Sequence, residues 1–439
     1  MNGIFRNGKF NAASLSRRSF IASTVAGGAA LALSGRTAFA QSSDTLKVGF
    51  ISPRTGPLGG FGETDGYVLE LARKALANGL QAGGKTWKVD ILDQDTQSDP
   101  SRASQLAKDL INNQAIDLML AVSTPETINP VADACEAGRH SLPLDGHALG
   151  SLVFRPRRKP GAPSPFKWTY HFGFGVEEFH KAYVSQWNLI ETNKKVGVMY
   201  PNDADGNAIR AHLAPALAKE GFTIVDPGAY ETGTTDFTAQ IALFRQEGVE
   251  IFNSFPIPPD FAAFWRQAAQ QGLTQQIKIC QIAKTGLFPS DIEALGDLGL
   301  NIGSAAYWHK AFPYKSTLTG VSGTELADGY ETASGKQWTQ QLGASLALLD
   351  AGFDALKASS DVKSKEAVAK AISTLKTTTI AGKVDFTSGP VANVSPGPII
   401  GTQWVKAPEG SKFALDYVVT ENATDPNVPV GAKLTAYNG

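Results

Sequence analysis

The chain contains little cysteine, and this limits what can hold its fold together. Only two of its 439 residues are cysteines, Cys135 and Cys280, and they show neither C-x-x-C nor metal-ligand spacing. A disulfide-rich scaffold is therefore excluded. Two buried free thiols are expected, and a single bridge between these distant segments is the alternative.

Signatures of catalysis and of cofactor binding are also missing. The sequence contains no G-x-S-x-G elbow, no H-E-x-x-H motif and no Walker loop, and its six histidines show no ligand spacing. These absences argue against an enzyme. They also give no support for a bound metal or cofactor.

An excess of charge of one sign is absent as well. The formal net charge is -1 at pH 7, and acidic and basic residues are interspersed. The sequence therefore lacks the electrostatic signature of a protein that binds nucleic acid or an anionic membrane. One basic cluster, Arg155 to Lys159, is followed by Pro and Gly. We interpret it as a solvated loop, with a partner-binding patch as the alternative.

A hydrophobic run long enough to span a membrane is not found near the N-terminus. The first 40 residues contain Ser16-Arg17-Arg18-Ser19-Phe20-Ile21, a mildly apolar run to Leu33, and a closing Ala38-Phe39-Ala40. A spanning helix needs about 20 strongly apolar residues, and this run is shorter and rich in Ala and Gly. The pattern is typical of a twin-arginine signal peptide, so residues 1–40 are predicted to be cleaved near Ala40. An ordinary amphipathic helix is the alternative.

What remains, about 399 residues, is long enough for two or three domains. From Leu46 onward, short β-branched apolar runs alternate with segments of helical period, which predicts parallel strands with crossover helices. The rhythm stops at a Pro/Arg-rich stretch, Phe154 to Pro165, and then restarts, so we expect two successive α/β lobes. The expected strands are Leu46–Ile51, Trp87–Leu92, Asp117–Val122, Lys195–Tyr200, Thr223–Pro227, Ile251–Phe255, Ile277–Ile282 and Asn301–Trp308. The expected helices are Glu63–Ala77, Pro100–Asn113, Pro125–Ala137, Gly206–Glu220, Phe237–Gln246, Phe261–Gln271, Thr339–Lys357 and Ser364–Leu375.

Two loops after predicted strands have features of a binding site. Glycines 56, 59, 60, 62 and 66 miss G-x-G-x-x-G and are better explained by a tight turn than by a dinucleotide site. Thr124-Pro125-Glu126-Thr127 offers an N-cap hydroxyl, a Pro at the first helical position and free backbone N–H groups. Such a terminus can hold an anion, and a merely well-capped helix is the alternative. Both loops follow the carboxyl ends of parallel strands, where ligands of open α/β sheets bind.

Several motifs in order resemble the periplasmic leucine/isoleucine/valine-binding proteins of ABC importers. The similarity covers nearly all of the chain after the signal. The motifs are Val48–Ser52, Thr55–Leu58, Gly60–Gly62, Leu92–Asp95 before Asp99-Pro100, Tyr200–Asp203 before Gly206, and Thr235–Thr238 before Ile241.

The resemblance implies a type I periplasmic binding protein: two doubly wound α/β lobes joined by a three-segment hinge. We place the hinge crossings near 170–173, 310–313 and 382–385. The N-terminal lobe is then 45–170 plus 312–383, and the C-terminal lobe is 171–311 plus 384–439. The implied protein is periplasmic, does not itself span a membrane, and delivers a small molecule to a membrane permease of an ABC importer.

The resemblance also implies which residues contact the ligand. An aromatic ring is expected at Phe61, and the ligand carboxylate is expected to be held by the loops around Thr124 and Asp145. The full set of expected ligand-binding residues is Phe61, Thr124, Glu126, Thr127, Asp145, Gly146, His147, Phe174, Asp205, Phe255, Lys284 and Trp308. For each aromatic residue, ordinary core packing is the alternative.

Where amino-acid binders of this family hold the α-ammonium with acidic groups, this sequence has Gly175 and Lys284. Asp145 or Asp205 could substitute, but the simpler expectation is an aromatic or short-chain carboxylate without an amino group. Lys284 or His147 would then be its counter-charge. Binding of a branched-chain amino acid or an amide is the alternative ligand class. A periplasmic sensor that uses the same clamshell is the alternative function.

Overall fold

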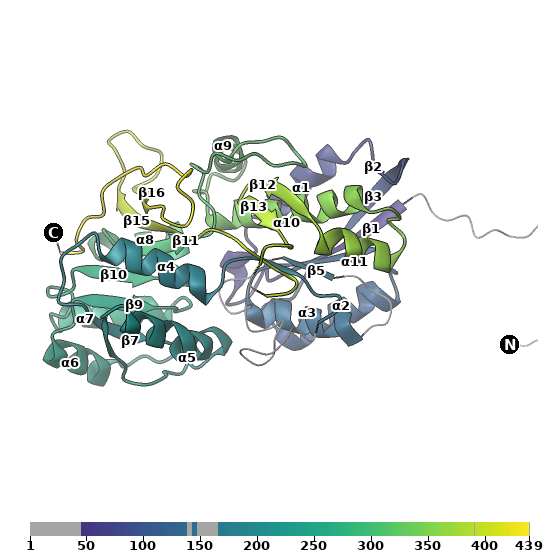
Figure 1. Ribbon diagram of the computed structural model, residues 1–439. Coiled ribbons are helices and arrows are strands. Elements are labelled where there is room, and N and C mark those ends of the chain that lie inside the picture. Colours follow the sequence, from purple (N-terminus) through teal and green to yellow (C-terminus); the bar gives the residue numbers. More distant parts are fainter. Residues whose placement is uncertain (1–44, 138–142, 147–165, 390, 439) are drawn as a thin grey trace, which may run out of the picture. The chain divides into compact units, whose positions relative to one another are not determined.

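The computed structural model describes residues 45–137, 143–146, 166–389 and 391–438 (Figure 1). The chain divides into residues 1–43 and one compact unit, residues 44–439. The predicted signal peptide therefore lies outside the described residues. Among those that are described, no helix combines the length and the apolar character needed to cross a membrane.

The compact unit contains a first sheet of seven strands. All neighbouring strands in it are parallel except β2, which is antiparallel to β3. In order across the sheet, the strands are β14 (Val394–Pro396), β6 (His171–Gly173), β5 (Pro143–Gly146), β4 (Leu118–Ala121), β1 (Thr45–Ser52), β3 (Lys85–Asp95) and β2 (Leu80–Ala82).

Strand β4 shows why this sheet is covered on both faces. All four of its residues are buried. Leu118 and Leu120 belong to the core formed with α1 and α10, whereas Met119 and Ala121 pack with α2 and α3. Figure 1 shows α2 and α3 on one side of the sheet and α1, α10 and α11 on the other. Continuous apolar strands of this kind are typical of parallel sheets between helical layers.

The helices on the first sheet begin with clear local signals. Asp99 accepts a hydrogen bond from the backbone N–H of Arg102 (2.8 Å), and Pro100 occupies the first helical position of α2. The other elements of this half are η1 (Gly59–Phe61), α1 (Asp65–Ala75), α2 (Pro100–Asn112), α3 (Pro125–Ala137), α9 (Gly323–Ser334), α10 (Gln340–Ala358), α11 (Lys365–Ser373) and the hairpin β12 (Lys376–Thr379) with β13 (Gly382–Asp385). Helices α9 and α11 pack against α10.

The second sheet also has seven strands, five of them parallel and two added antiparallel at one edge. In order across the sheet, they are β16 (Leu415–Glu421), β15 (Ile400–Lys406), β11 (Gly303–Ala306), β10 (Ile279–Ile282), β9 (Ile251–Ser254), β7 (Lys195–Met199) and β8 (Thr223–Val225). The associated helices are α4 (Val176–Trp187), α5 (Ala204–Lys219), α6 (Thr238–Glu247), α7 (Asp260–Gln270), η2 (Lys284–Leu287), α8 (Pro289–Glu293) and η3 (Gly296–Gly299). Helix α4 packs beside α5, and α6 beside α7.

The predicted fold class, two α/β halves with parallel sheets, is confirmed, but the third passage between the sheets comes later than predicted. β6 and β14 both belong to the first sheet, where they pair with each other. The first passage therefore follows Gly173, and the third occupies 397–399; the predicted crossing at 382–385 forms strand β13 instead. The first and third passages touch, because the backbone N–H of Gly397 donates a hydrogen bond to the carbonyl of Gly173. The other predicted lobe boundaries stay a prediction.

The two cysteines lie in different parts of this architecture. Cys135 is buried on α3 and Cys280 is buried on β10, and they are not joined in a disulfide. The prediction of two buried thiols is confirmed. Burial also raises the pKa of the Cys280 thiol well above its ordinary value, which keeps that thiol protonated.

Candidate functional site

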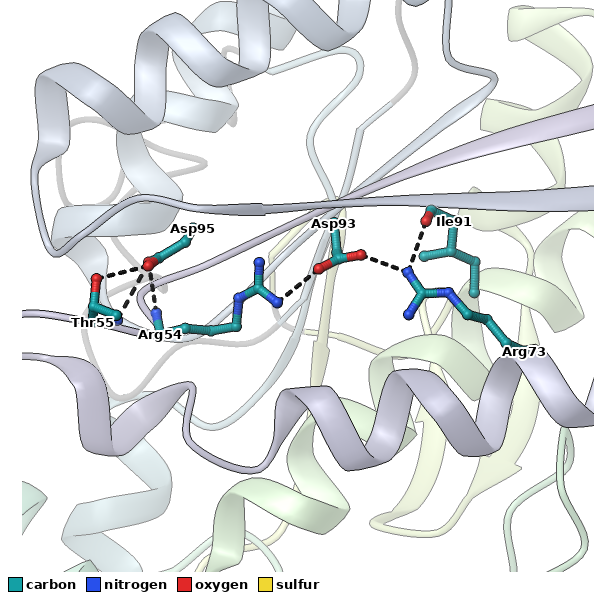
Figure 2. A network of polar contacts seen from close by, with 6 residues as sticks. All are labelled: Arg54, Thr55, Arg73, Ile91, Asp93 and Asp95. Atoms are coloured by element: carbon teal, nitrogen blue, oxygen red, sulfur yellow. Dashed lines mark hydrogen bonds and ion pairs between the residues drawn. The ribbon is translucent and has the colours of Figure 1, made fainter.

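The loop that follows β1 carries Phe61 and is held by Asp95 at the end of β3 (Figure 2). Asp95 Oδ1 accepts from the backbone N–H groups of Arg54 (2.9 Å) and Gln97 (2.8 Å), and Oδ2 accepts from the Thr55 hydroxyl (2.7 Å). Burial acts to raise the pKa of Asp95, but these hydrogen bonds outweigh it and lower the pKa overall. The carboxylate is therefore an ionised anchor for the start of the loop.

Asp93 ties the same loop to helix α1. Figure 2 shows its carboxylate between two guanidinium groups, with Arg54 at 2.7 Å and Arg73 at 2.5 Å. Arg73 also donates to the carbonyl of Ile91 (3.0 Å). Burial alone would raise the pKa of Asp93, but the two arginines lower it. The network makes the position of the Phe61 loop depend on the end of β3.

Replacing Asp95 by alanine is expected to destabilise the protein by about 1–2 kcal/mol, because several loop donors lose their acceptor. Ligand affinity should fall several-fold as the Phe61 loop becomes less ordered. Urea unfolding and calorimetric titration would measure the two effects. Asp90→Ala is the matched control, since Asp90 is exposed on the same strand and its side chain makes no hydrogen bond or ion pair with the described residues. Equal behaviour of the two variants would contradict the anchoring role.

Phe61 lies where the two halves of the unit meet. Its ring is 1% exposed and packs edge-on against Phe288, with centroids 5.0 Å apart and planes at 87°. Both rings line a cavity of about 640 Å³, here called the Phe61 cavity. Its other lining residues fall within 54–66 and 290–291, with Pro258 and Lys336.

The glycines of the predicted tight turn allow other parts of the chain to approach the wall of this cavity closely. Gly56 has φ +84°, and a Cβ there would lie 2.8 Å from the carbonyl oxygen of Gln97. A Cβ on Gly60 would lie 3.2 Å from the Phe288 ring. The predicted turn is confirmed, and its lack of side chains allows Phe288 to approach.

The two basic groups at the rim of the Phe61 cavity are already paired. Lys336 forms an ion pair with Glu63, and Arg54 is engaged by Asp93. Burial raises the pKa of Asp291 to about 6, and the nearby Glu63 carboxylate adds to this shift. The walls therefore combine aromatic rings with a rim on which Lys336 and Arg54 are paired and Asp291 has no ion-pair partner among the described residues.

A second feature brings together three of the predicted site residues, Glu126, Asp205 and Lys284. The Lys284 side chain is 2% exposed, and its Nζ lies 2.9 Å from Asp205 Oδ2 and 3.3 Å from Asp203 Oδ2. Glu126, on α3, is close enough to raise the pKa of both Asp205 and Lys284. Its Oε2 is buried without a hydrogen-bond partner in the described part of the chain. We call Lys284, Asp203, Asp205 and Glu126 the Lys284 cluster.

This pairing corrects the role predicted for Lys284. Burial opposes the charged ammonium, but Asp205 and Asp203 more than compensate and raise the pKa of Lys284. Burial raises the pKa of Asp205 to about 7, although Lys284 acts in the opposite direction. Lys284 is thus neutralised by protein carboxylates and is not an unpaired counter-charge for a ligand.

The other residues predicted to hold a carboxylate lie on α3 and β5. Thr124 and Thr127 are buried, with their hydroxyl oxygens 3.5 Å apart, and the Thr127 N–H donates to the Thr124 carbonyl (3.0 Å). Asp145 and Gly146 end strand β5 and pair with β6. His147 lies outside the described residues, so its predicted role stays a prediction.

Three predicted aromatic residues pack in the core and are not among the residues lining the Phe61 cavity. Phe174 packs against Phe179 (5.2 Å) and Tyr307 (5.4 Å). Phe255 also packs against Phe179, at 5.1 Å. Trp308 is fully buried, with Trp338 edge-on at 5.7 Å. For these three, the core-packing alternative describes the contacts that are observed.

Sequence reasoning did not single out Asp203 or Phe288 as site residues. Asp203 carried a local signal, since it caps α5 by accepting from the backbone N–H of Gly206 (2.6 Å). Phe288 had no local sequence signal, because its partner Phe61 comes from a distant part of the sequence. Only the packing of the two halves brings these rings together.

Comparisons with known proteins agree with this architecture. The sequence profile of the periplasmic binding protein family matches residues 45–399, so the protein belongs to this family. Over 257 residues, 56% of this chain, it is 21% identical to the leucine-, isoleucine-, valine-, threonine- and alanine-binding protein of Pseudomonas aeruginosa. The chain spans 62% of that relative's length.

Two solved structures share the fold, each with a TM-score of 0.67. One is a leucine-binding protein from Thermotoga maritima, 18% identical, with 87% of this chain and 99% of that chain covered. The other is an ABC transporter solute-binding protein from Rhodopseudomonas palustris in complex with 3,4-dihydroxybenzoic acid, 19% identical, with the same coverage. The predicted resemblance and the type I periplasmic binding fold are confirmed.

Proposed function

We propose that this protein is the exported receptor of an ABC importer, which captures a small carboxylate between its two halves and delivers it to a membrane permease. Membership of the periplasmic binding protein family supports this proposal. The twin-arginine pattern in residues 1–40 supports export to the periplasm. Two α/β halves connected by three passages offer the flexible joint that capture by closure needs.

The proposed ligand is an aromatic or short-chain acid without an amino group. The observation that carries this choice is that two aromatic rings in edge-on contact with each other, Phe61 and Phe288, line the Phe61 cavity. Edge-on aromatic contacts contribute about 0.5–1.5 kcal/mol beyond area burial, so a ligand ring that packs beside this pair would be favoured. The related structure from Rhodopseudomonas palustris was solved with a dihydroxybenzoic acid, which is in the same chemical class.

In this proposal the ligand carboxylate is held by the first turn of α3 and the end of β5. A helix N-terminus contributes about 0.3–2 kcal/mol to an anion, in addition to hydrogen bonds. Thr124 and Thr127 supply hydroxyl groups there, and Asp145, Gly146 and His147 are the proposed second loop. His147 is the proposed counter-charge, since Lys284 is already paired.

A branched-chain amino acid is the second candidate ligand. One observation favours it: Glu126 Oε2 is a buried carboxylate oxygen without a hydrogen-bond partner among the described residues. A ligand ammonium would be a suitable partner for such an oxygen. Several relatives are named for amino acids of this class, which agrees with this candidate.

Calorimetric titration of the refolded protein would separate the two ligand classes. Benzoate, 4-hydroxybenzoate and 3,4-dihydroxybenzoate are expected to include a ligand with micromolar or tighter affinity, about 8 kcal/mol of binding free energy. Leucine is expected to bind at least about 100-fold more weakly, because Asp203 and Asp205, which could pair with its ammonium, are already paired with Lys284. Tight binding of leucine without binding of any acid would reverse the order of the two candidates.

A further inference from the structure

The Lys284 ammonium is buried and lies between carboxylate groups, an arrangement that suits a cation. Its side chain is 2% exposed, and two carboxylates lie within 3.3 Å of Nζ. Lys284 itself has φ +50°, an uncommon backbone conformation for a residue with a side chain. A buried charge is tolerated only when it is paired in this way, so the acids and the ammonium depend on one another.

The acids of the Lys284 cluster come from both halves of the unit. Asp203 and Asp205 lie at the start of α5, which follows β7, and Glu126 lies in the first turn of α3, which follows β4. Lys284 follows β10. Each residue thus stands beyond the carboxyl end of a parallel strand, which is where ligands of open α/β sheets bind. Helices α3 and α5 lie close together, which brings Glu126 near the pair.

We propose that Lys284 is a resident ammonium, which fills the cation site formed by Asp203, Asp205 and Glu126 and thereby excludes ligands that carry an α-ammonium. This specificity role rests on the proposed function as a solute receptor. A tethered ammonium acts at an effective concentration that a free ligand does not match. A ligand ammonium would have to displace this tethered one from Asp203 and Asp205, and discrimination of this kind against a competing ligand is a source of specificity.

The first experiment asks whether a free amine can replace the side chain. Lys284→Ala should lose stability, and propylammonium at tenfold over its dissociation constant should raise the melting temperature of this variant by about 2 °C. The melting temperature of the wild type should change no more with propylammonium than with NaCl at the same concentration. If Lys284→Ala does not fold alone, its refolding yield with and without propylammonium is the readout. Absence of any amine dependence would overturn the proposal.

A matched variant tests whether the carboxylates form the amine site. In Lys284→Ala with Asp203→Asn, Asp205→Asn and Glu126→Gln, all four charged groups of the cluster are removed together, and Asn still caps α5. This variant should fold and should not respond to propylammonium. An equal response in both variants would mean that the amine binds elsewhere, and it would overturn the proposal.

The second experiment measures specificity with pairs of ligands that differ only in the amino group. The pairs are phenylacetate with phenylglycine, and 4-methylpentanoate with leucine. Wild type should bind the member without the amino group more tightly. In Lys284→Ala, the ratio of the two dissociation constants should fall at least about tenfold. An unchanged preference would contradict the specificity role. If wild type binds neither member of either pair, the proposed ligand class fails, while the propylammonium experiment still decides the role of Lys284.

Discussion

Replacing Gly343 by alanine is expected to destabilise the protein by about 3 kcal/mol, the upper end of typical overpacking effects. The three atoms nearest to a Cβ built on Gly343 all belong to the Trp308 indole, and they lie too close for any carbon to fit. Trp308 is 0% exposed and is enclosed by Trp338, so the ring has no space into which it can turn. The contact joins α10, on the first sheet, to the passage that leaves β11 of the second sheet.

Gly66→Ala is the matched control for this prediction. Gly66 is exposed on α1, and nothing lies within 4 Å of a Cβ built there. This substitution should stabilise the helix by about 0.5–1 kcal/mol, because glycine loses more backbone entropy than alanine on folding. Urea unfolding of both variants gives the comparison. A Gly343→Ala variant within about 0.5 kcal/mol of wild type would show that the Trp308 passage adapts easily.

Acidification below pH 6.5 is expected to remove up to about 3 kcal/mol of stability through His309. His309 is buried next to Trp308, on the same passage between the sheets. Its Nε2–H donates to the Tyr417 carbonyl (2.7 Å), and its Nδ1 accepts from the backbone N–H of Ala311 (3.0 Å). Both bonds together require a neutral ring, because a protonated Nδ1 cannot accept.

The sign of this effect follows from the direction of the pKa shift. Burial lowers the pKa of His309 from 6.5 to about 4; the Tyr417 carbonyl and Asp416 oppose the shift, and Lys310 adds to it. The folded state therefore binds fewer protons than the unfolded chain between these values. The stabilisation is fully present above pH 6.5 and is lost as the pH falls through about 4. The Trp338 ring, edge-on at 4.8 Å, completes the apolar surroundings.

Other buried groups titrate in the same range, so the measurement must isolate His309. Burial lowers the pKa of His171 to about 4 and raises the pKa of Asp65 and Asp350 to about 6, and the two acids act in the opposite sense. Comparing wild type with His309→Gln cancels these shared contributions, and Gln keeps a donor for the Tyr417 carbonyl. The stability gap between the two proteins should shrink by about 2–3 kcal/mol from pH 7 to pH 4. A constant gap would contradict the neutral-ring requirement.

Most of the architecture could be predicted from the sequence because it depends on local pattern. The run Leu46–Ile51 appears as β1, Pro125–Ala137 appears with the same bounds as α3, and Thr339–Lys357 appears as α10. Apolar runs and capping residues act over a few neighbouring positions, and these are visible along the chain. The short strands β2, β5, β6 and β14 were not predicted, because three or four residues carry no clear period.

Three residues of the predicted site lie together in the structure, and their contact with a ligand stays a prediction. Glu126, Asp205 and Lys284 were all expected near the ligand, and the structure brings them together. That Lys284 is paired with Asp205 and Asp203 was not foreseen, because the charge state of a lysine depends on which acids face it across the fold. The sequence also left undecided whether Phe174, Phe255 and Trp308 pack in the core or contact a ligand, because this depends on which residues face them in the fold.

The export pattern, the α/β class and the family resemblance were therefore all contained in the order of residues, since each depends on periodicity or on a short motif. Tertiary structure decided where the chain passes between the sheets, how Phe61 meets Phe288, and that the Lys284 ammonium is neutralised inside the protein. These features join residues that are distant in sequence. Burial and pair geometry, which set their energies, exist only once the chain has folded.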